Sequence, residues 1–163
     1  MPEDGRAVVA DTGPLHYLVL VGRINLLQQL FGTVAVPATV IAELRHASAP
    51  PEVRTWTGAL PSWLAVHPDP STPAPELLRL DPGERAAIML AHTLGAGLLL
   101  IDDRAGAVAA RARGLEAVGT VGLIIRMAAA RLLDLPEGVA ALRATNFRYP
   151  AGMFDALLEE YCP

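Results

Sequence analysis

Five acidic side chains stand at places in this sequence where a carboxylate could do chemistry. Asp11 directly follows a short apolar run, and Asp102 and Asp103 directly follow another. Glu43 lies among apolar residues, and Glu84 lies at the start of a helical pattern. Carboxylates that are held close together repel, and each raises the pKa of its neighbours. A cluster of them is tolerated when a divalent cation sits in it, and oxygen ligands suit Mg²⁺ or Mn²⁺.

Each of these acids also has an ordinary explanation as a structural residue. Asp11 and either Asp102 or Asp103 could cap the helix that follows it. Glu84 could be the glutamate of a capping box in which Asp81 caps the helix and Pro82 occupies its first position. Glu43 could belong to a solvated helix face. One such position is weak evidence for a site, whereas the whole set predicts one if the fold brings its members together.

Short apolar runs alternate with helical patterns along the chain. The runs predict strands at residues 7–10, 33–36, 63–66, 97–101 and 116–119. Such alternation indicates a parallel sheet that is covered on both faces by helices. Ligands bind beyond the carboxyl ends of the strands in such sheets. Asp11 and the Asp102–Asp103 pair lie there, so both positions are candidates for the site.

The helical patterns place the remaining acids. They predict helices over residues 14–31 with a break near Gly22, 37–45 opened by Pro37, 82–94, 104–113, 121–133, 136–143 and 150–161. Residues 46–62 are less regular, and residues 67–75 hold four prolines and are expected to form a loop. Because 163 residues suit one domain, a single domain over residues 1–163 is expected.

Residue types exclude several classes of site. All 13 cationic residues are arginine, so the lysine of a phosphate loop, a Schiff-base lysine and a Ser–Lys pair are all absent. Cys162 is the single cysteine, which excludes a disulfide framework and a cysteine-rich zinc site within one chain. The four histidines are scattered, which disfavours a zinc site. A hydrophobic fraction of 52% excludes a disordered chain.

Charge is distributed unevenly along the chain. The net charge is −4 and the pI about 5.5, so no bulk basic field attracts nucleic acid. Residues 1–103 carry 6 Arg and 11 acids, a net of −5, while residues 104–163 carry 7 Arg and 6 acids, a net of +1. The acidic start lacks the basic region of a signal peptide, and no apolar run reaches the length of a membrane span. We therefore expect a soluble cytoplasmic protein without membrane contact.

Three stretches resemble a known family. They are residues 8–44, which begin VVADTG, residues 80–106, with LDPGERAA and LLLIDDRAG, and residues 114–124, GLEAVGTVGLI. In order and spacing they are similar to the PIN domain family of metal-dependent ribonucleases, and most closely to the PIN-like branch related to VapC-type toxins. The resemblance implies a PIN-like three-layer α/β/α fold with a central, mostly parallel sheet.

The resemblance also implies a role for each acid. The family's catalytic acids match Asp11, Glu43, Glu84 and the pair Asp102 and Asp103. Asp11, Glu84 and the Asp102–Asp103 pair are the implied metal ligands for Mg²⁺ or Mn²⁺. The family often shows Thr-x-Asp at the strand exit, whereas this chain has isoleucine in place of the threonine. The sequence does not decide which of the two aspartates is the ligand.

Two further residues are candidates for binding the substrate. Thr12 matches the small polar residue that commonly follows the first aspartate of the family, and Arg104 could place a phosphate near the site. Arg111 and Arg113 are better explained as solvated charges on a helix face. The implied reaction is metal-assisted hydrolysis of an RNA phosphodiester, in which activated water attacks in line with the leaving oxygen.

The expected biological role is that of the toxin half of a toxin–antitoxin pair, with RNA as substrate, a cognate antitoxin as possible partner and a homodimer as the simplest assembly. One alternative is a catalytically weak PIN-like module that acts through protein–protein contacts. Another is a phosphatase-like enzyme, but Gly13 stands where its second aspartate belongs. The DTG at residues 11–13 is found in aspartic proteases as well, but the helical pattern after it disfavours their β-rich fold.

Overall fold

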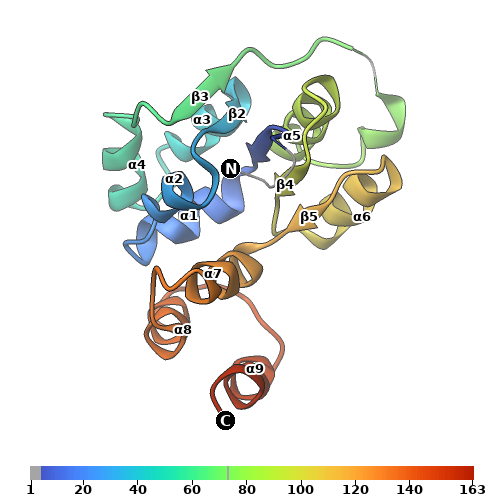
Figure 1. Ribbon diagram of the computed structural model, residues 1–163. Coiled ribbons are helices and arrows are strands. Elements are labelled where there is room, and N and C mark those ends of the chain that lie inside the picture. Colours follow the sequence, from blue (N-terminus) through green and yellow to red (C-terminus); the bar gives the residue numbers. More distant parts are fainter. Residues whose placement is uncertain (1–4, 73) are drawn as a thin grey trace.

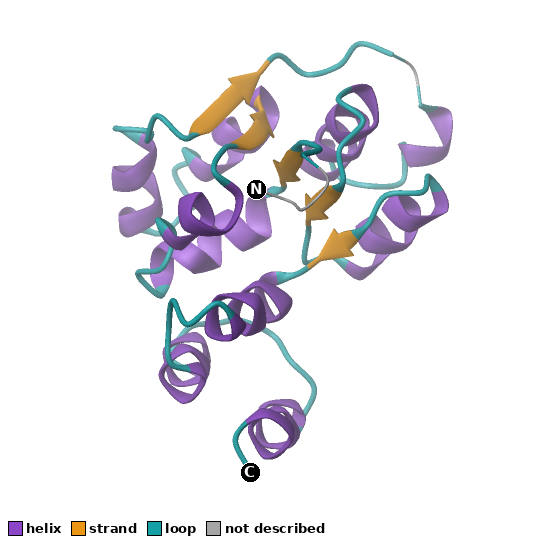
Figure 2. Ribbon diagram, viewed as in Figure 1, coloured by secondary structure: helices purple, strands orange, loops and turns teal. Residues whose placement is uncertain are grey.

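The computed structural model describes residues 5–72 and 74–163 of the chain. Over these residues the strands form one five-stranded sheet in the order β3-β2-β1-β4-β5, and every pair in it is parallel (Figures 1 and 2). The strands are β1 Val8–Ala10, β2 Val34–Pro37, β3 Leu64–His67, β4 Leu98–Leu100 and β5 Ala117–Val118. The predicted α/β class is confirmed, and the sheet is wholly parallel rather than mostly so.

Helices flank the sheet and continue beyond it. They are α1 Thr12–Leu20, α2 Leu26–Phe31, α3 Ala38–Leu44, α4 Pro51–Thr57, α5 Pro82–Thr93, α6 Arg104–Ala112, α7 Thr120–Ala129, α8 Leu135–Arg143 and α9 Met153–Tyr161, with a 3-10 turn at Pro75–Leu77. The predicted break near Gly22 is confirmed, because this glycine has a φ of 72° and separates α1 from α2. A left-handed backbone of this kind ends a helix readily only at glycine.

Alternate residues of each strand face opposite layers. Val8 and Ala10 of β1 pack with α1, α2, α3, α4 and α7, whereas Val9 packs with α5 and α6. Figure 2 shows the resulting layers, with the sheet between the two groups of helices. Side chains of successive strand residues point to opposite faces, so an all-apolar strand is what a doubly covered sheet requires. The three-layer arrangement expected from the sequence is therefore confirmed.

Two sequence expectations need correction. Residues 46–62, expected to be less regular, contain the regular helix α4. Pro51 lies at the first turn of α4, where its missing N–H costs no hydrogen bond. Pro37 ends β2 and precedes α3 instead of occupying the first helical position. Its extended ψ of 153° places it on the strand side of the boundary.

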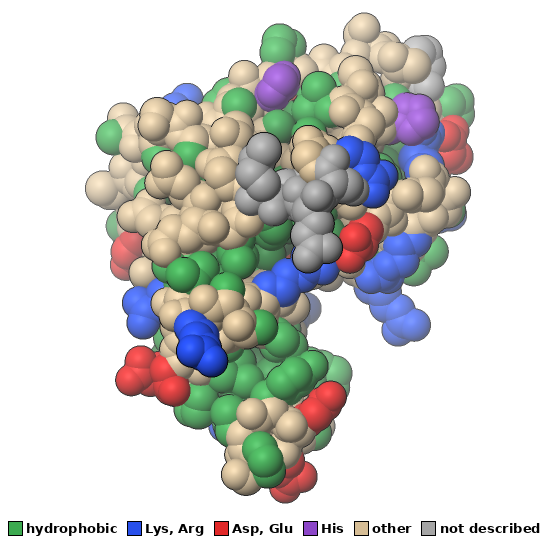
Figure 3. Space-filling model, viewed as in Figure 1, with side chains coloured by type: hydrophobic (Ala, Val, Ile, Leu, Met, Phe, Trp, Pro, Cys, Tyr) green, Lys and Arg blue, Asp and Glu red, His purple; other side chains and the backbone are tan. Residues whose placement is uncertain are grey.

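The last helices form a cluster of their own. Ile124 of α7 packs with Leu135, Val139 and Leu142 of α8 and with Phe154 of α9. Figure 1 shows α8 and α9 beyond the sheet, on the side of α7. In the space-filling view hydrophobic side chains gather over this region, while arginine side chains project on the side where α6 lies (Figure 3). Within the described residues, no helix is long and apolar enough to cross a membrane.

Candidate functional site

The register of the sheet brings three strand exits to one edge. Ala10 of β1 pairs with Leu100 of β4, and Leu100 pairs with Val118 of β5. The ladder continues past β1, since the Asp11 N–H donates to the Leu100 carbonyl at 2.8 Å. The residues that follow these strands therefore meet at the carboxyl edge of the sheet, where ligands bind in such folds. They include Asp11 and Asp102.

Asp11 is buried without the bond that a helix cap would make. It precedes α1, but its side chain makes no capping hydrogen bond, and only 5% of the residue is exposed. Its Oδ1 atom is buried and has no hydrogen-bond partner among the described residues. Buried polar atoms are almost always partnered, so such an atom calls for an explanation in terms of function. The capping explanation of Asp11 is thus not what the structure shows.

The charge of Asp11 is disfavoured by its surroundings. The pKa of Asp11 is raised to about 7, chiefly by burial. A hydrogen bond from the Thr12 backbone opposes the rise, and the negative charges of Glu43, Asp81 and Asp102 add to it. Three carboxylates from distant parts of the chain therefore lie near enough to act on this one. The role of Asp11, Glu43 and Asp102 in one site stays a prediction.

Glu43 is anchored by two donors from other elements. The hydroxyl of Thr12, at the start of α1, donates to Oε2 of Glu43, and the N–H of Gly83 in α5 donates to Oε1 at 3.1 Å. A Cβ added at Gly83 would collide with this carboxylate, so the position has room only for glycine. Thr12 was predicted to bind substrate. In the structure its hydroxyl donates a hydrogen bond to Glu43, one of the candidate catalytic residues.

Glu84 lies in the first turn of α5 behind a confirmed cap. Asp81 accepts a hydrogen bond from the Glu84 N–H at 3.1 Å, as the capping signal predicts. Burial raises the pKa of Glu84, the adjacent Asp81 carboxyl raises it further, and Asp103 and Asp11 add smaller effects. Asp81 therefore acts electrostatically on both Asp11 and Glu84. Sequence reasoning missed this, because the residue already had a sufficient role as a cap.

The two aspartates after β4 have different environments. Asp103 is exposed and caps α6 by accepting from the Gly106 N–H at 2.8 Å. Asp102 is turned the other way and accepts from Thr120, through its backbone N–H and its hydroxyl, at 2.7 Å each. Burial raises the pKa of Asp102, and these two bonds oppose the rise. Of the pair, Asp102 is the carboxylate whose negative charge raises the pKa of Asp11, whereas Asp103 acts on Glu84.

Glycines leave space around the Asp102 carboxylate. A Cβ added at Gly13 would lie 2.8 Å from Oδ2, and one added at Gly119 would lie 2.8 Å from Oδ1. Both distances are shorter than a methyl group tolerates beside an oxygen, so each glycine admits the carboxylate by lacking a side chain. Gly119 and Thr120 were not named as site residues, because nothing in the sequence shows that β5 lies beside β4.

His16 is a second residue that sequence reasoning missed. It lies one helical turn beyond Gly13 in α1, and its half-buried ring packs edge-on against Tyr17. Burial lowers the pKa of His16, while the nearby Asp102 carboxylate raises it. The i, i+3 spacing from Gly13 was the available signal, since such residues share a helix face.

Arg104 is close to the acids in sequence but makes no hydrogen bond or ion pair with them among the described residues. It is exposed at the first residue of α6, two positions after Asp102. Its role in placing a phosphate stays a prediction. The predicted site residues are thus divided between an inner group, formed by Asp11, Glu43, Glu84 and Asp102, and the exposed pair Asp103 and Arg104.

The inner group offers oxygen donors only, which suit Mg²⁺ or Mn²⁺. The unpartnered Asp11 Oδ1 and the glycines beside Asp102 both fit a cation at this edge. As the side chains stand, no three His, Cys, Asp or Glu groups of residues 5–72 and 74–163 are arranged so that they could hold a metal ion.

Comparison with known proteins places the chain in a family. Residues 7–161 match the family model described as PIN domain (DUF3368). A search of the curated proteins found no match. Among solved structures, a PilT N-terminus domain protein from the hyperthermophilic archaeon Sulfolobus solfataricus P2 is similar, with 15% identity and a TM-score of 0.49 over 88% of this chain and 98% of that one. The match of the family model to residues 7–161, nearly the whole chain, shows that the protein belongs to the PIN domain family, whose members are generally nucleases and typically depend on a divalent metal.

Proposed function

We propose that this protein is an endoribonuclease that hydrolyses RNA phosphodiester bonds with the help of Mg²⁺ or Mn²⁺. The observation that carries the proposal is the buried Asp11 carboxylate. It has an unpartnered oxygen and lies within electrostatic reach of Glu43, Asp81 and Asp102. A protein that only needed a stable fold would be better served by a neutral residue there, because an unpaired buried charge is costly.

Asp11, Glu84 and Asp102 are the residues that would hold the cation. When bound, the cation supplies Lewis-acid chemistry, which is neutralisation of charge on the scissile phosphate and activation of the attacking water. Asp103 is assigned instead to the cap of α6, because its carboxylate is exposed and bonded to Gly106. Thr120 holds Asp102 in one orientation through two hydrogen bonds.

Glu43 has a different part in the proposed reaction. Its oxygens are anchored by Thr12 and Gly83, so the carboxylate is fixed in place beside Asp11. A carboxylate held in this way can orient the attacking water and accept its proton. Arg104, at the exposed start of α6, is the cation proposed to contact the phosphate backbone.

The test is cleavage of a labelled single-stranded RNA by the purified chain. Cleavage is expected with Mn²⁺ or Mg²⁺ and is expected to stop with EDTA or in Asp11→Asn. Asp103→Asn is the matched control, because asparagine also caps a helix, and it should keep most of the activity. Cleavage that survives both EDTA and Asp11→Asn would refute the metal mechanism.

The biological role proposed with this activity is that of the toxin in a toxin–antitoxin pair, with a protein antitoxin as inhibitor and a homodimer as the active assembly. Support comes from the hydrophobic side chains over α7 to α9, which offer a surface for another protein chain (Figure 3). Growth arrest on expression of the wild-type chain, absent for Asp11→Asn, is the expected result. Sedimentation of the purified chain as a monomer would refute the proposed homodimer.

A second candidate is a catalytically weak PIN-like module that acts through protein contacts. It is favoured by the observation that, among the described residues, no three acids stand ready to hold a metal ion. It is disfavoured by the acidic set itself, which lacks none of the members that the family pattern asks for. A calorimetric titration with Mn²⁺ separates the two candidates. A binding module should give no heat of binding, whereas a nuclease should show a saturable site that is lost in Asp11→Asn.

A further inference from the structure

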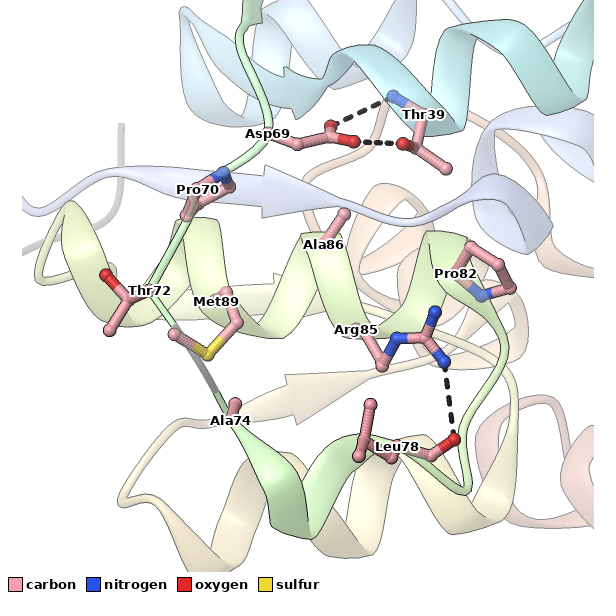
Figure 4. Close-up of a pocket in the computed structure, with 10 residues that line it drawn as sticks. All are labelled: Thr39, Asp69, Pro70, Thr72, Ala74, Leu78, Pro82, Arg85, Ala86 and Met89. Atoms are coloured by element: carbon pink, nitrogen blue, oxygen red, sulfur yellow. Dashed lines mark hydrogen bonds between the residues drawn. The ribbon is translucent and has the colours of Figure 1, made fainter.

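A cleft runs along one face of α5, outside the acidic group. Its volume is about 310 Å³. The helix contributes Pro82, Arg85, Ala86 and Met89 to its lining, which is the spacing of a single helix face. Figure 4 shows these residues along the helix, with Pro82 and Arg85 toward one end of the cleft and Met89 toward the other. The volume lies at the small end of the range for ligand sites, ~300–1,000 Å³.

The opposite wall is fixed to α3 by one carboxylate. Asp69 accepts from the Thr39 N–H at 3.0 Å and from the Thr39 hydroxyl, so the loop after β3 is tied to the start of α3 (Figure 4). Both oxygens of Asp69 are engaged by these donors. The carboxylate is therefore a structural anchor of the wall, with both of its oxygens hydrogen-bonded to Thr39.

Arg85 places a positive charge at the end of the cleft near Pro82. Its Nη1 donates to the Leu78 carbonyl at 3.3 Å and to the Leu80 carbonyl at 2.7 Å. These bonds hold the guanidinium in place, and neither Nε nor Nη2 donates to another residue in the part of the chain that the structure describes. A held guanidinium with spare donors is suited to a phosphate group.

The rest of the lining is largely apolar. Met89 and Pro70 lie on opposite walls, and Leu78 is exposed to 68%, which is unusual for a leucine that lines a cleft. A ligand that matches this surface has a negative group at one end and an apolar ring at the other. A nucleotide unit has this form, since its phosphate is charged and its base has apolar faces that pack on side chains.

The elements that line the cleft also carry the acids. Thr39 lies one helical turn before Glu43 in α3, and Arg85 directly follows Glu84 in α5. The Gly83 N–H, between them, bonds to Glu43. We propose that the cleft binds one nucleotide of the RNA strand beside the scissile phosphate, with Arg85 on its phosphate, Leu78, which lies beside Arg85, against the adjoining ribose, and Met89 at the other end of the cleft against its base. The identity of the strand as RNA rests on the proposed function.

Binding is tested without cleavage by following methionine methyl groups by NMR. The metal-free Asp11→Asn variant is used, because it is expected to be inactive and carries one negative charge fewer. Tetrauridylate is expected to shift the Met89 methyl signal, while Met127 in the core and Met153 in α9 stay unmoved. An unmoved Met89 signal at saturating RNA would overturn the site.

The same experiment distinguishes a strand from a free nucleotide. Uridine monophosphate is expected to shift the Met89 signal only at higher concentration than tetrauridylate, because the strand also contacts the protein through its neighbouring phosphates. Equal or tighter binding of the monophosphate would overturn the assignment to a strand and would make this a site for free nucleotides.

A kinetic arm uses the active protein. Leu78→Ser is expected to raise the KM for RNA about fivefold with kcat unchanged, since only an apolar contact with the ribose next to the bound phosphate is lost. Val108→Ser, at an exposed apolar residue of α6, is the control and should change neither value. Arg85→Lys keeps the charge and should raise the KM less than Arg85→Gln does.

An unchanged KM in Leu78→Ser, with cleavage by the wild type intact, refutes the subsite and leaves the nuclease proposal standing. A Met89 shift with RNA but no cleavage refutes the nuclease and leaves the subsite.

Discussion

Thr120 donates two hydrogen bonds to the carboxylate of Asp102, one from its backbone N–H and one from its hydroxyl, each 2.7 Å long. Thr120 is completely buried and begins α7, so the bonds join the exit of β4 to the next helix after β5. They favour the ionised carboxylate against the effect of burial, which raises its pKa. The two bonds therefore fix the orientation of Asp102 against α7, whereas Asp103 is fixed as the cap of α6.

Removal of the Thr120 hydroxyl is predicted to weaken the site and the fold together. Thr120→Val keeps the shape and the backbone N–H but loses one bond to a buried carboxylate, which costs about 1.5–3 kcal/mol of stability. Thermal or urea unfolding measures the loss, and calorimetry should show weaker Mn²⁺ binding. Thr120→Ser retains the hydroxyl and should behave nearly as the wild type. Equal loss in both variants would contradict the assigned hydrogen bond.

The metal-free protein is predicted to lose stability as the pH rises. The pKa of Asp11 is about 7 in the folded chain and 3.8 for the ordinary group, so between these values the folded state holds a proton that the unfolded state has released. The stability that the folded protein gains from this proton on Asp11 is thus complete below about pH 4 and is lost as the pH rises through about 7.

Urea unfolding in EDTA at pH 5.5 and pH 8 measures this effect. Asp11→Asn cannot ionise, so its stability should fall less over the same interval and should exceed that of the wild type at pH 8. Added Mn²⁺ should restore the wild type at pH 8, because a ligand that binds only the folded state stabilises it. A wild type that gains stability from pH 5.5 to pH 8 in EDTA would contradict the burial of the Asp11 charge.

The aspartates after β4 are predicted to separate stability from metal binding. Asp103→Ala removes the cap of α6 and should cost about 1 kcal/mol, with Mn²⁺ affinity nearly unchanged. Asp102→Asn should largely abolish the Mn²⁺-dependent rise in melting temperature. The melting temperatures of both variants with and without Mn²⁺ give the comparison. Loss of the metal response in Asp103→Ala, with retention in Asp102→Asn, would reverse the assignment.

The glycines around Asp102 are predicted to tolerate no side chain. An alanine at Gly119 would bring a methyl group 2.8 Å from Oδ1, so the carboxylate must rotate and give up its bonds to Thr120. Gly119→Ala should cost about 1–3 kcal/mol and lower Mn²⁺ affinity. The backbone φ of −93° is open to any residue, so the effect is one of space and not of strain. Gly58→Ala, in the turn after α4, is the control for metal affinity: its added Cβ would lie 3.2 Å from the Thr55 carbonyl oxygen, so it should cost stability, but Mn²⁺ affinity should not change because the position is remote from the acids.

The helical boundaries show how far local signals reach. The start of α5 at Asp81 and Pro82 was predictable, because capping and the fixed φ of proline act within one turn. Pro51 likewise lies in the first turn of α4, although residues 46–62 show no regular helical pattern in the sequence. Proline can interrupt a helix or begin one, so it does not decide between the two. The burial of Val53 and Thr57 favours the helix, and that burial depends on the packing of the core.

The sequence by itself determined the strand–helix alternation, the buried character of the strands and the acids at their exits, because residue periodicity and apolar content act locally along the chain. Only the tertiary structure decided which strands are neighbours, and hence that Thr120 reaches Asp102 while Asp103 caps α6. It also decided that Thr12 holds Glu43 and that Asp81 acts on Asp11. Hydrogen bonds and charge interactions depend on distance in space, and strand order joins residues that are far apart in the chain.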